Sequence, residues 1–270
     1  KENNKTVIVR KAVERRDEAS LLENTINQLD AEDCLRHING RLYGNDYEER
    51  LFNVAMELCI TWMNRILFLK LLEAQMLKYH NGDAIYKFLS ITKIHDYDDL
   101  NTLFFQVLAR DMGSRTHSIM RDFAYVPYLN SSLFEVTDLE SKTIKINSLS
   151  QRTVLPVLAS SVLRNKKRNL QVNALPTLQY LFAFLDAYNF ASEGSEEVQE
   201  EAKTLINASV LGLIFEKING HKDGSVFTPG FITMFMCREA ITKTVLQKFN
   251  GYYGWNCTTR IELYNHIDNI

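Results

Sequence analysis

Residues 48–80, "EERLFNVAMELCITWMNRILFLKLLEAQMLKYH", constrain the fold more than any other stretch of the chain. Apolar side chains recur there at steps of three and four residues, which is the spacing of one face of an α-helix. These side chains are Leu51, Val54, Ala55, Leu58, Trp62, Ile66, Leu69 and Leu72. Met63, Leu67 and Phe68 lie between them and widen the apolar face, so the helix needs neighbours on several sides. We expect a central, largely enclosed helix that ends at Asn81-Gly82-Asp83.

Further helical patterns predict a mainly α protein, a bundle-like connector of several helices with at most one small β-hairpin. We expect helices in residues 98–111, with Asp98 or Asp99 as the N-cap, and near residues 153–163, 175–190 and 196–219. Thr143 to Ile146 alternate as a short strand does, so we place the hairpin there. We expect two domains, a helical connector over residues 1–200 and a helical segment over residues 201–270.

Composition excludes several classes of function. The net charge is −2 and the isoelectric point is near 6.4, so there is no overall basic field for nucleic acid. No apolar run reaches the roughly 20 residues that span a bilayer, so we expect no membrane partner. The four cysteines are far apart and lack the paired spacing of a zinc site or a disulfide framework. A reduced, cytoplasmic setting is the simplest interpretation.

Residues 224–230, "GSVFTPG", break the helical texture in a chain that has only four prolines. Thr228 suits an N-cap and Pro229 suits the first helical position, because proline lacks the amide that would be unpaired there. We expect a helix from Pro229 to about Phe249, ended by Asn250-Gly251. The unpaired amides of such a helix start favour a carboxylate or phosphate. Alternatively, Phe227 is a hydrophobic staple over the first turn and no ligand binds.

Residues 206–241, "INASVLGLIFEKINGHKDGSVFTPGFITMFMCREAI", resemble the segment that opens the methyltransferase domain of type IIG restriction-modification enzymes. These are single bacterial chains that join an endonuclease to an adenine-N6 DNA methyltransferase. The resemblance extends over about residues 40–265. It implies that Gly224, Phe227, Thr228 and Pro229 form part of a pocket for S-adenosylmethionine and contact its methionine end. Double-stranded DNA and flanking nuclease and methyltransferase domains are the partners that it implies.

The same resemblance implies that this stretch of chain is not catalytic alone. Adenine methylation needs a loop that holds the flipped base and a glycine-rich turn that holds the cofactor. The sequence contains no Pro-Pro pair and no closely spaced glycine turn after a strand. Because the chain begins with Lys1 and stops after "LYNHIDNI", we expect a segment of a longer polypeptide. The alternative is a non-enzymatic helical scaffold or protein-interaction module.

Two weaker patterns also bear on DNA. Arg164, Lys166, Lys167 and Arg168 form the one concentrated basic run, "RNKKR". It suits a phosphate backbone, but no aromatic residues interleave with the charges, so we favour a solvated helix end. Glu140-Ser141-Lys142, with Asp122 or Asp138 upstream, offers the residue types of a metal-dependent nuclease. Such short matches arise easily by chance.

The spacing of the histidines and of the other aromatic residues indicates structural roles. The six histidines show no paired spacing with cysteine or carboxylate, so we expect no metal site. Trp62 and the aromatic residues through Phe68 are interpreted as core. The apolar residues of the last long helix are interpreted in the same way; they are Phe231, Met234, Phe235 and Phe249.

Overall fold

The structure is a computed structural model that describes residues 8–129, 131–147, 149, 154–163, 173–190, 204–206, 208–219, 228 and 230–268. The chain divides into two compact units, unit 1 from Lys1 to His221 and unit 2 from Lys222 to Ile270. Most of the described residues lie in helices, which confirms the mainly α fold. The two units are described separately below.

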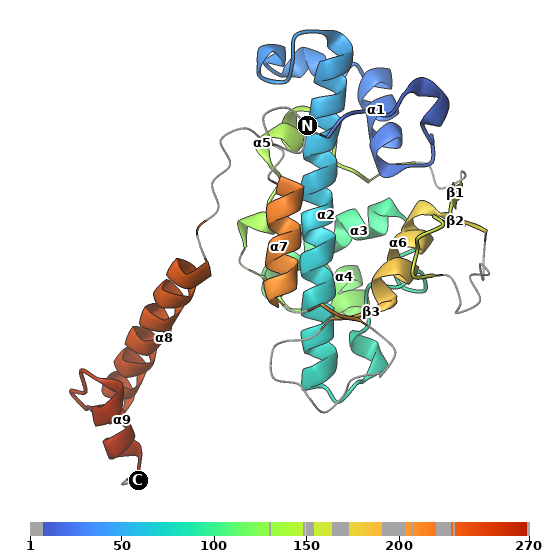
Figure 1. Ribbon diagram of the computed structural model, residues 1–270. Coiled ribbons are helices and arrows are strands. Elements are labelled where there is room, and N and C mark those ends of the chain that lie inside the picture. Colours follow the sequence, from blue (N-terminus) through green and yellow to red (C-terminus); the bar gives the residue numbers. More distant parts are fainter. Residues whose placement is uncertain are drawn as a thin grey trace. The chain divides into compact units, whose positions relative to one another are not determined.

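The helix α2 (Tyr47–Tyr79) forms the centre of unit 1 (Figure 1). It begins where the side chain of Asp46 accepts a hydrogen bond from the Glu49 amide, as an N-cap does. It ends where Asn81 and Gly82 adopt left-handed φ angles of 53° and 80°. The Gly82 amide then donates to a carbonyl of the last turns of the helix at 2.7 Å. Both the helix and its predicted end are confirmed.

Shorter helices pack around α2 in unit 1. They are α1 (Leu21–Ala31), α3 (Tyr97–Thr102), α4 (His117–Phe123), α5 (Asp138–Lys142), α6 (Thr177–Asp186) and α7 (Ala208–Asn219). A π-helical turn, Leu103–Leu108, continues α3. Short 3-10 turns occupy Val13–Arg15, Cys34–His37, Gly40–Leu42, Ala84–Tyr86, Met112–Ser114 and Ser132–Phe134.

The N-cap of α3 differs from the sequence prediction. Asp96, and not Asp98 or Asp99, accepts hydrogen bonds from the amides of the first turn. Asp98 and Asp99 instead lie inside that turn, where a negative charge is favourable next to the positive end of the helix dipole.

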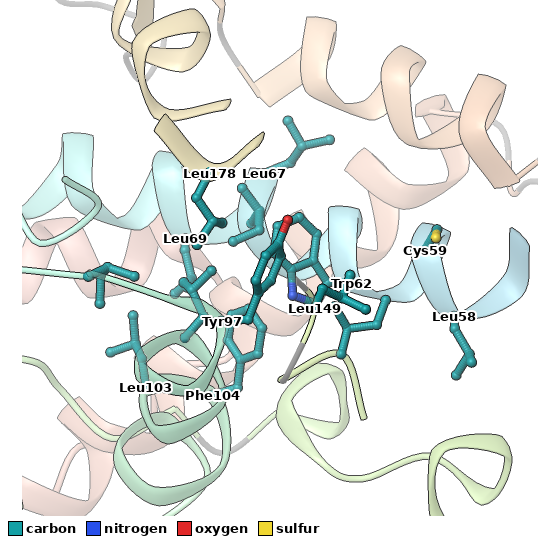
Figure 2. Close-up of a cluster of buried hydrophobic side chains, with 14 of the residues drawn as sticks. Leu58, Cys59, Trp62, Leu67, Leu69, Tyr97, Leu103, Phe104, Leu149 and Leu178 are labelled. Atoms are coloured by element: carbon teal, nitrogen blue, oxygen red, sulfur yellow. The ribbon is translucent and has the colours of Figure 1, made fainter. Parts of the chain in front are cut away.

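The core of unit 1 lies along α2. Every residue of the predicted apolar face is buried except Leu72, which is partly buried and packs against the same core. The Trp62 ring lies 5.8 Å from the Tyr97 ring of α3, and Figure 2 shows Leu69, Phe104 and Leu149 in the same cluster. The core therefore joins segments that are far apart in the sequence.

The strands lie elsewhere than predicted. β1 (Val154–Pro156) and β2 (Ala174–Pro176) pair antiparallel, and β3 (Tyr188–Phe190) and β4 (Thr204–Ile206) pair parallel. No strand occurs over residues 143–147, so the hairpin predicted there is wrong. The alternation instead reflects burial, because Ile144 and Ile146 are buried and Lys145 between them is exposed.

Three predicted helices of unit 1 need correction. The helix expected over residues 175–190 is the shorter α6, because β2 extends to Pro176 before it and β3 begins at Tyr188 after it. The described residues 154–163 contain β1 and no helix, since Pro156 cannot donate the backbone hydrogen bond that a helix interior requires. Of the helix expected over residues 196–219, residues 196–203 lie outside the described residues. The described remainder holds β4 and then α7, which ends at Asn219 as expected. α7 packs against α2, and Leu211 enters the core.

Unit 2 consists of α8 (Gly230–Tyr253) and α9 (Arg260–Ile267). α8 runs past the predicted stop at Asn250-Gly251, because the Asn250 side chain is held by the backbone N–H and carbonyl of Cys257. Gly254, with a φ of 70°, ends the helix instead. α9 begins at a capping box of Thr259 and Glu262.

Candidate functional site

The candidate site predicted from the sequence lies at the start of α8. Thr228 lies outside the helix, is exposed, and precedes the first helical residue, Gly230, by two positions. The described part of the helix begins at Gly230, next to the predicted first residue. Of the four predicted cofactor residues, only Thr228 is described; Gly224, Phe227 and Pro229 lie outside the described residues.

The first two turns of α8 carry a set of exposed apolar side chains, which we call the apolar collar. Its members are Phe231, Ile232, Met234, Phe235, Met236 and Cys237. Phe231 is 75% exposed, Met234 64% and Phe235 63%. The prediction that these three residues are core is wrong for unit 2 as the structure describes it. Phe249 is partly buried and packs against the small core of this unit.

The second half of α8 is covered on one side by α9. Leu246 packs there with Cys257 and Leu263. The Trp255 ring lies between those of Tyr253 and His266, with centroid distances of 4.6 Å and 4.9 Å and nearly parallel planes. Burial and ring stacking thus hold the two helices together at this end. This packing does not extend to the apolar collar, whose residues are all exposed.

The predicted basic run lies outside the described residues. Arg164, Lys166, Lys167 and Arg168 fall on the connection between β1 and β2, whose register pairs Val154 with Pro176. The two strands fix the described ends of this connection next to each other. A contact between the run and DNA therefore stays a prediction.

The residues of the nuclease-like pattern serve structural roles. Both terminal nitrogens of the Arg65 guanidinium bind the carboxylate of Glu140, and Arg65 also donates to the carbonyls of Leu133 and Glu135. Burial acts to raise the pKa of Glu140, but the hydrogen bonds and charge of Arg65 outweigh it and hold this pKa below its ordinary value. Lys142 pairs with Asp138 at the surface. The Glu140 carboxylate is therefore already paired with Arg65.

A second buried ionic network was not predicted. The Lys70 ammonium of α2 lies 2.6 Å from carboxylate oxygens of both Glu73 and Asp186, and Lys87 also binds Asp186. Glu73 accepts a further hydrogen bond from the Leu89 amide. Burial acts to lower the pKa of Lys70, but the two carboxylates outweigh it and raise this pKa. The sequence feature that could have indicated this network is the presence of ionisable residues within the wide apolar face of α2.

The part of the chain that the structure describes contains no cluster of three metal-ligating side chains and no membrane-spanning helix. No three histidine, cysteine or acidic side chains among these residues are arranged to hold a metal ion. No helix within the same residues combines the length and the apolar character required to cross a bilayer. Burial raises the pKa of the Cys59 thiol to about 12, so this cysteine is unreactive in the folded protein.

Comparison with known proteins gives a family and no activity. A family described as Domain of unknown function (DUF7814) matches residues 1–206. The chain belongs to the DUF7814 family. The DUF7814 segment includes α2 and the strand pairs and ends with β4, ahead of α7 and of all of unit 2. No curated protein and no solved structure matches the chain.

Proposed function

We propose that the chain is part of a bacterial, cytoplasmic type IIG restriction enzyme and adenine-specific DNA methyltransferase. Unit 1 links the nuclease to the methyltransferase, and unit 2 opens the methyltransferase domain. The start of α8 supplies the Gly-x-x-Phe-Thr-Pro part of the S-adenosylmethionine pocket. The chain does not methylate DNA by itself, since the loops that hold cofactor and base are not in its sequence. Double-stranded DNA is the substrate of the whole enzyme.

The position of Thr228 carries this proposal. It lies exposed outside a helix of 24 residues and two positions ahead of its first residue. The first amides of a helix have no partner within the helix, and they lie at the positive end of its dipole. The carboxylate of the methionine end of S-adenosylmethionine is an anion that such amides bind. The resemblance of "GSVFTP" to the cofactor motif supports the same ligand.

Titration of the isotope-labelled chain with S-adenosylmethionine tests the proposal. We expect amide signals of Thr228, Gly230, Phe231 and Ile232 to shift in NMR spectra, while those of α2 stay in place. Weak binding is expected, because four residues make up only a small part of a cofactor pocket. Decarboxylated S-adenosylmethionine is the matched control, because it keeps the adenosine and the sulfonium but lacks the carboxylate.

The same titration separates the proposal from a non-enzymatic scaffold. A scaffold has no reason to respond to the cofactor at α8. Equal shifts with the decarboxylated control would place the contact away from the helix amides. Absence of any shift at millimolar cofactor would count against the proposal and leave the scaffold as the better description.

A further inference from the structure

The helix α7 lies outside the family segment but inside unit 1. The segment that matches DUF7814 ends at Ile206, the last residue of β4, whereas unit 1 continues to His221. α7 begins two residues after this end and runs alongside α2 (Figure 1), which is its principal neighbour among the described elements. One side of the central helix is therefore covered by a helix that the family segment does not include.

A single stripe of apolar side chains on α7 makes this contact. Successive residues of a helix lie about 100° apart around its axis, so residues at steps of three and four share one side. Leu211 is 2% exposed, and the apolar residues at these steps after it are partly buried against the same core; they are Ile214, Phe215 and Ile218. The rest of unit 1 leaves the opposite side uncovered, which carries Gly212, Leu213, Glu216 and Lys217. α7 thus binds through one face.

The core of unit 1 is built almost entirely within the family segment. As far as the structure describes them, all its buried residues other than Leu211 lie between Ile26 and Phe190. α7 has 12 residues, and an isolated helix of this length is marginal in water. The helical state of α7 therefore depends on its contact with α2, whereas the core around α2 depends little on α7.

The pattern of contacts is that of a helix bound in a groove. Apolar anchors at positions i, i+3, i+4 and i+7 are the means by which an amphipathic helix binds a receptor surface. Leu211, Ile214, Phe215 and Ile218 occupy these four positions in order. The kind of partner that the α2 surface fits is therefore a short amphipathic helix with this spacing.

We propose that the family segment forms a helix-docking surface along α2 and that α7 is its ligand. The covalent connection at residue 207 holds α7 at a high effective concentration, so the chain fills its own surface. The connection itself makes no part of the apolar contact. The same helix supplied as a separate molecule therefore binds the surface when the chain's own α7 cannot. This inference does not rest on the proposed cofactor site.

A variant of the intact chain that releases α7 provides the test. Leu211→Asp places a carboxylate at the buried anchor, where an unpaired charge is not accommodated. Leu213→Asp places the same charge on the uncovered side and is the matched control. The probe is a fluorescein-labelled peptide of residues 207–219. We expect its fluorescence anisotropy to rise with the Leu211→Asp chain, and its dissociation constant to be at least about tenfold higher for the unmodified and Leu213→Asp chains.

Variant peptides show whether the same face is used in binding. A peptide that carries Leu211→Asp should not bind the released chain, and one that carries Leu213→Asp should bind it as the unmodified peptide does. Circular dichroism of the mixture should show a gain of helix over the sum of the separate components, because the free peptide is marginally helical.

Two results would overturn the proposal. One is a Leu211→Asp chain that stays folded and does not bind the peptide, or equal binding of the peptide to all three chains. The other is a Leu211→Asp chain that unfolds and is not refolded by the peptide, since α7 would then be inseparable from the core. An unfolded variant that the peptide refolds would support the docking surface. Titration with S-adenosylmethionine reports on α8, so failure of either proposal is recognised without the other.

Discussion

Arg65 of α2 and Glu140 of α5 form a buried, two-pronged ion pair across 75 positions of sequence, with Nη2 of Arg65 2.9 Å from Oε2 of Glu140. The guanidinium carbon also lies 4.9 Å from the centre of the Phe105 ring. All the polar atoms of the pair face each other or backbone groups. The pair fixes the segment around α5 against the central helix.

Loss of one partner of this pair should be strongly destabilising. We expect Glu140→Ala to lower the free energy of unfolding by about 3–5 kcal/mol, because it leaves the charge of Arg65 buried and unpaired. Urea unfolding followed by circular dichroism measures the change. Lys142→Ala is the matched control, since its pair with Asp138 is exposed and should contribute less than about 1 kcal/mol. Equal effects of the two changes would contradict the structural role of the pair.

The same carboxylate should make stability depend on pH. The folded-state pKa of Glu140 lies below its ordinary value of 4.5, so its contribution is present above that pH. The contribution is lost as the pH falls through the lowered folded-state pKa. Glu140→Gln should therefore cost most near neutral pH, and the difference from the unmodified chain should shrink as the pH falls below about 4.5. A difference that is constant between pH 7 and pH 3 would exclude this linkage.

The Lys70 network permits a comparison of buried and exposed lysines on one carboxylate. Lys70→Met removes the ammonium that pairs with the buried Glu73, so we expect a loss of about 3–5 kcal/mol. Lys87→Met removes a half-exposed ammonium from Asp186, and we expect a loss below about 1 kcal/mol. Thermal and urea unfolding of both variants test this order. A larger loss of stability in the Lys87 variant would contradict this order. It would show that the exposed ion pair at Asp186 contributes more than the buried ion pair at Glu73.

α7 should be part of the stable fold although the family segment ends before it. Leu211 of α7 is 2% exposed and packs in the core around α2, whereas Leu213 two positions later is 61% exposed. We expect Leu211→Ala to cost about 2–5 kcal/mol through lost burial and the cavity left behind. Leu213→Ala should change stability by less than about 0.5 kcal/mol. Similar values for both variants would mean that α7 does not dock on α2 in solution.

Local patterns in the sequence were sufficient for the central helix. The apolar spacing of α2 and the stop at Asn81-Gly82 depend on residues within a few turns of each other, and both were predicted. The position of Thr228 outside the helix and the presence of α8 after it could also be predicted from neighbouring residues. By contrast, the end of α8 was missed because the Asn250 side chain pairs with the Cys257 backbone, a contact made only after the chain turns back.

The partners of the buried charged residues could not be predicted from the sequence. Arg65 finds Glu140, and Lys70 finds Asp186, at separations of 75 and 116 positions. No periodicity links such residues, because their pairing depends on which helices pack around α2. The alternation at Ile144 and Ile146 was similarly ambiguous, since an extended segment buried by its side chains shows the same pattern as a strand.

The sequence by itself determined the central helix α2 and the apolar face that it buries, because both arise from side chains a few positions apart. The tertiary structure alone decided what each apolar or charged group meets. For the residues along α2, the partners are other parts of unit 1. For the apolar collar of α8, the structure leaves the same kind of side chain exposed. Burial is a property of the whole packing arrangement, and no local pattern specifies the surface that provides it.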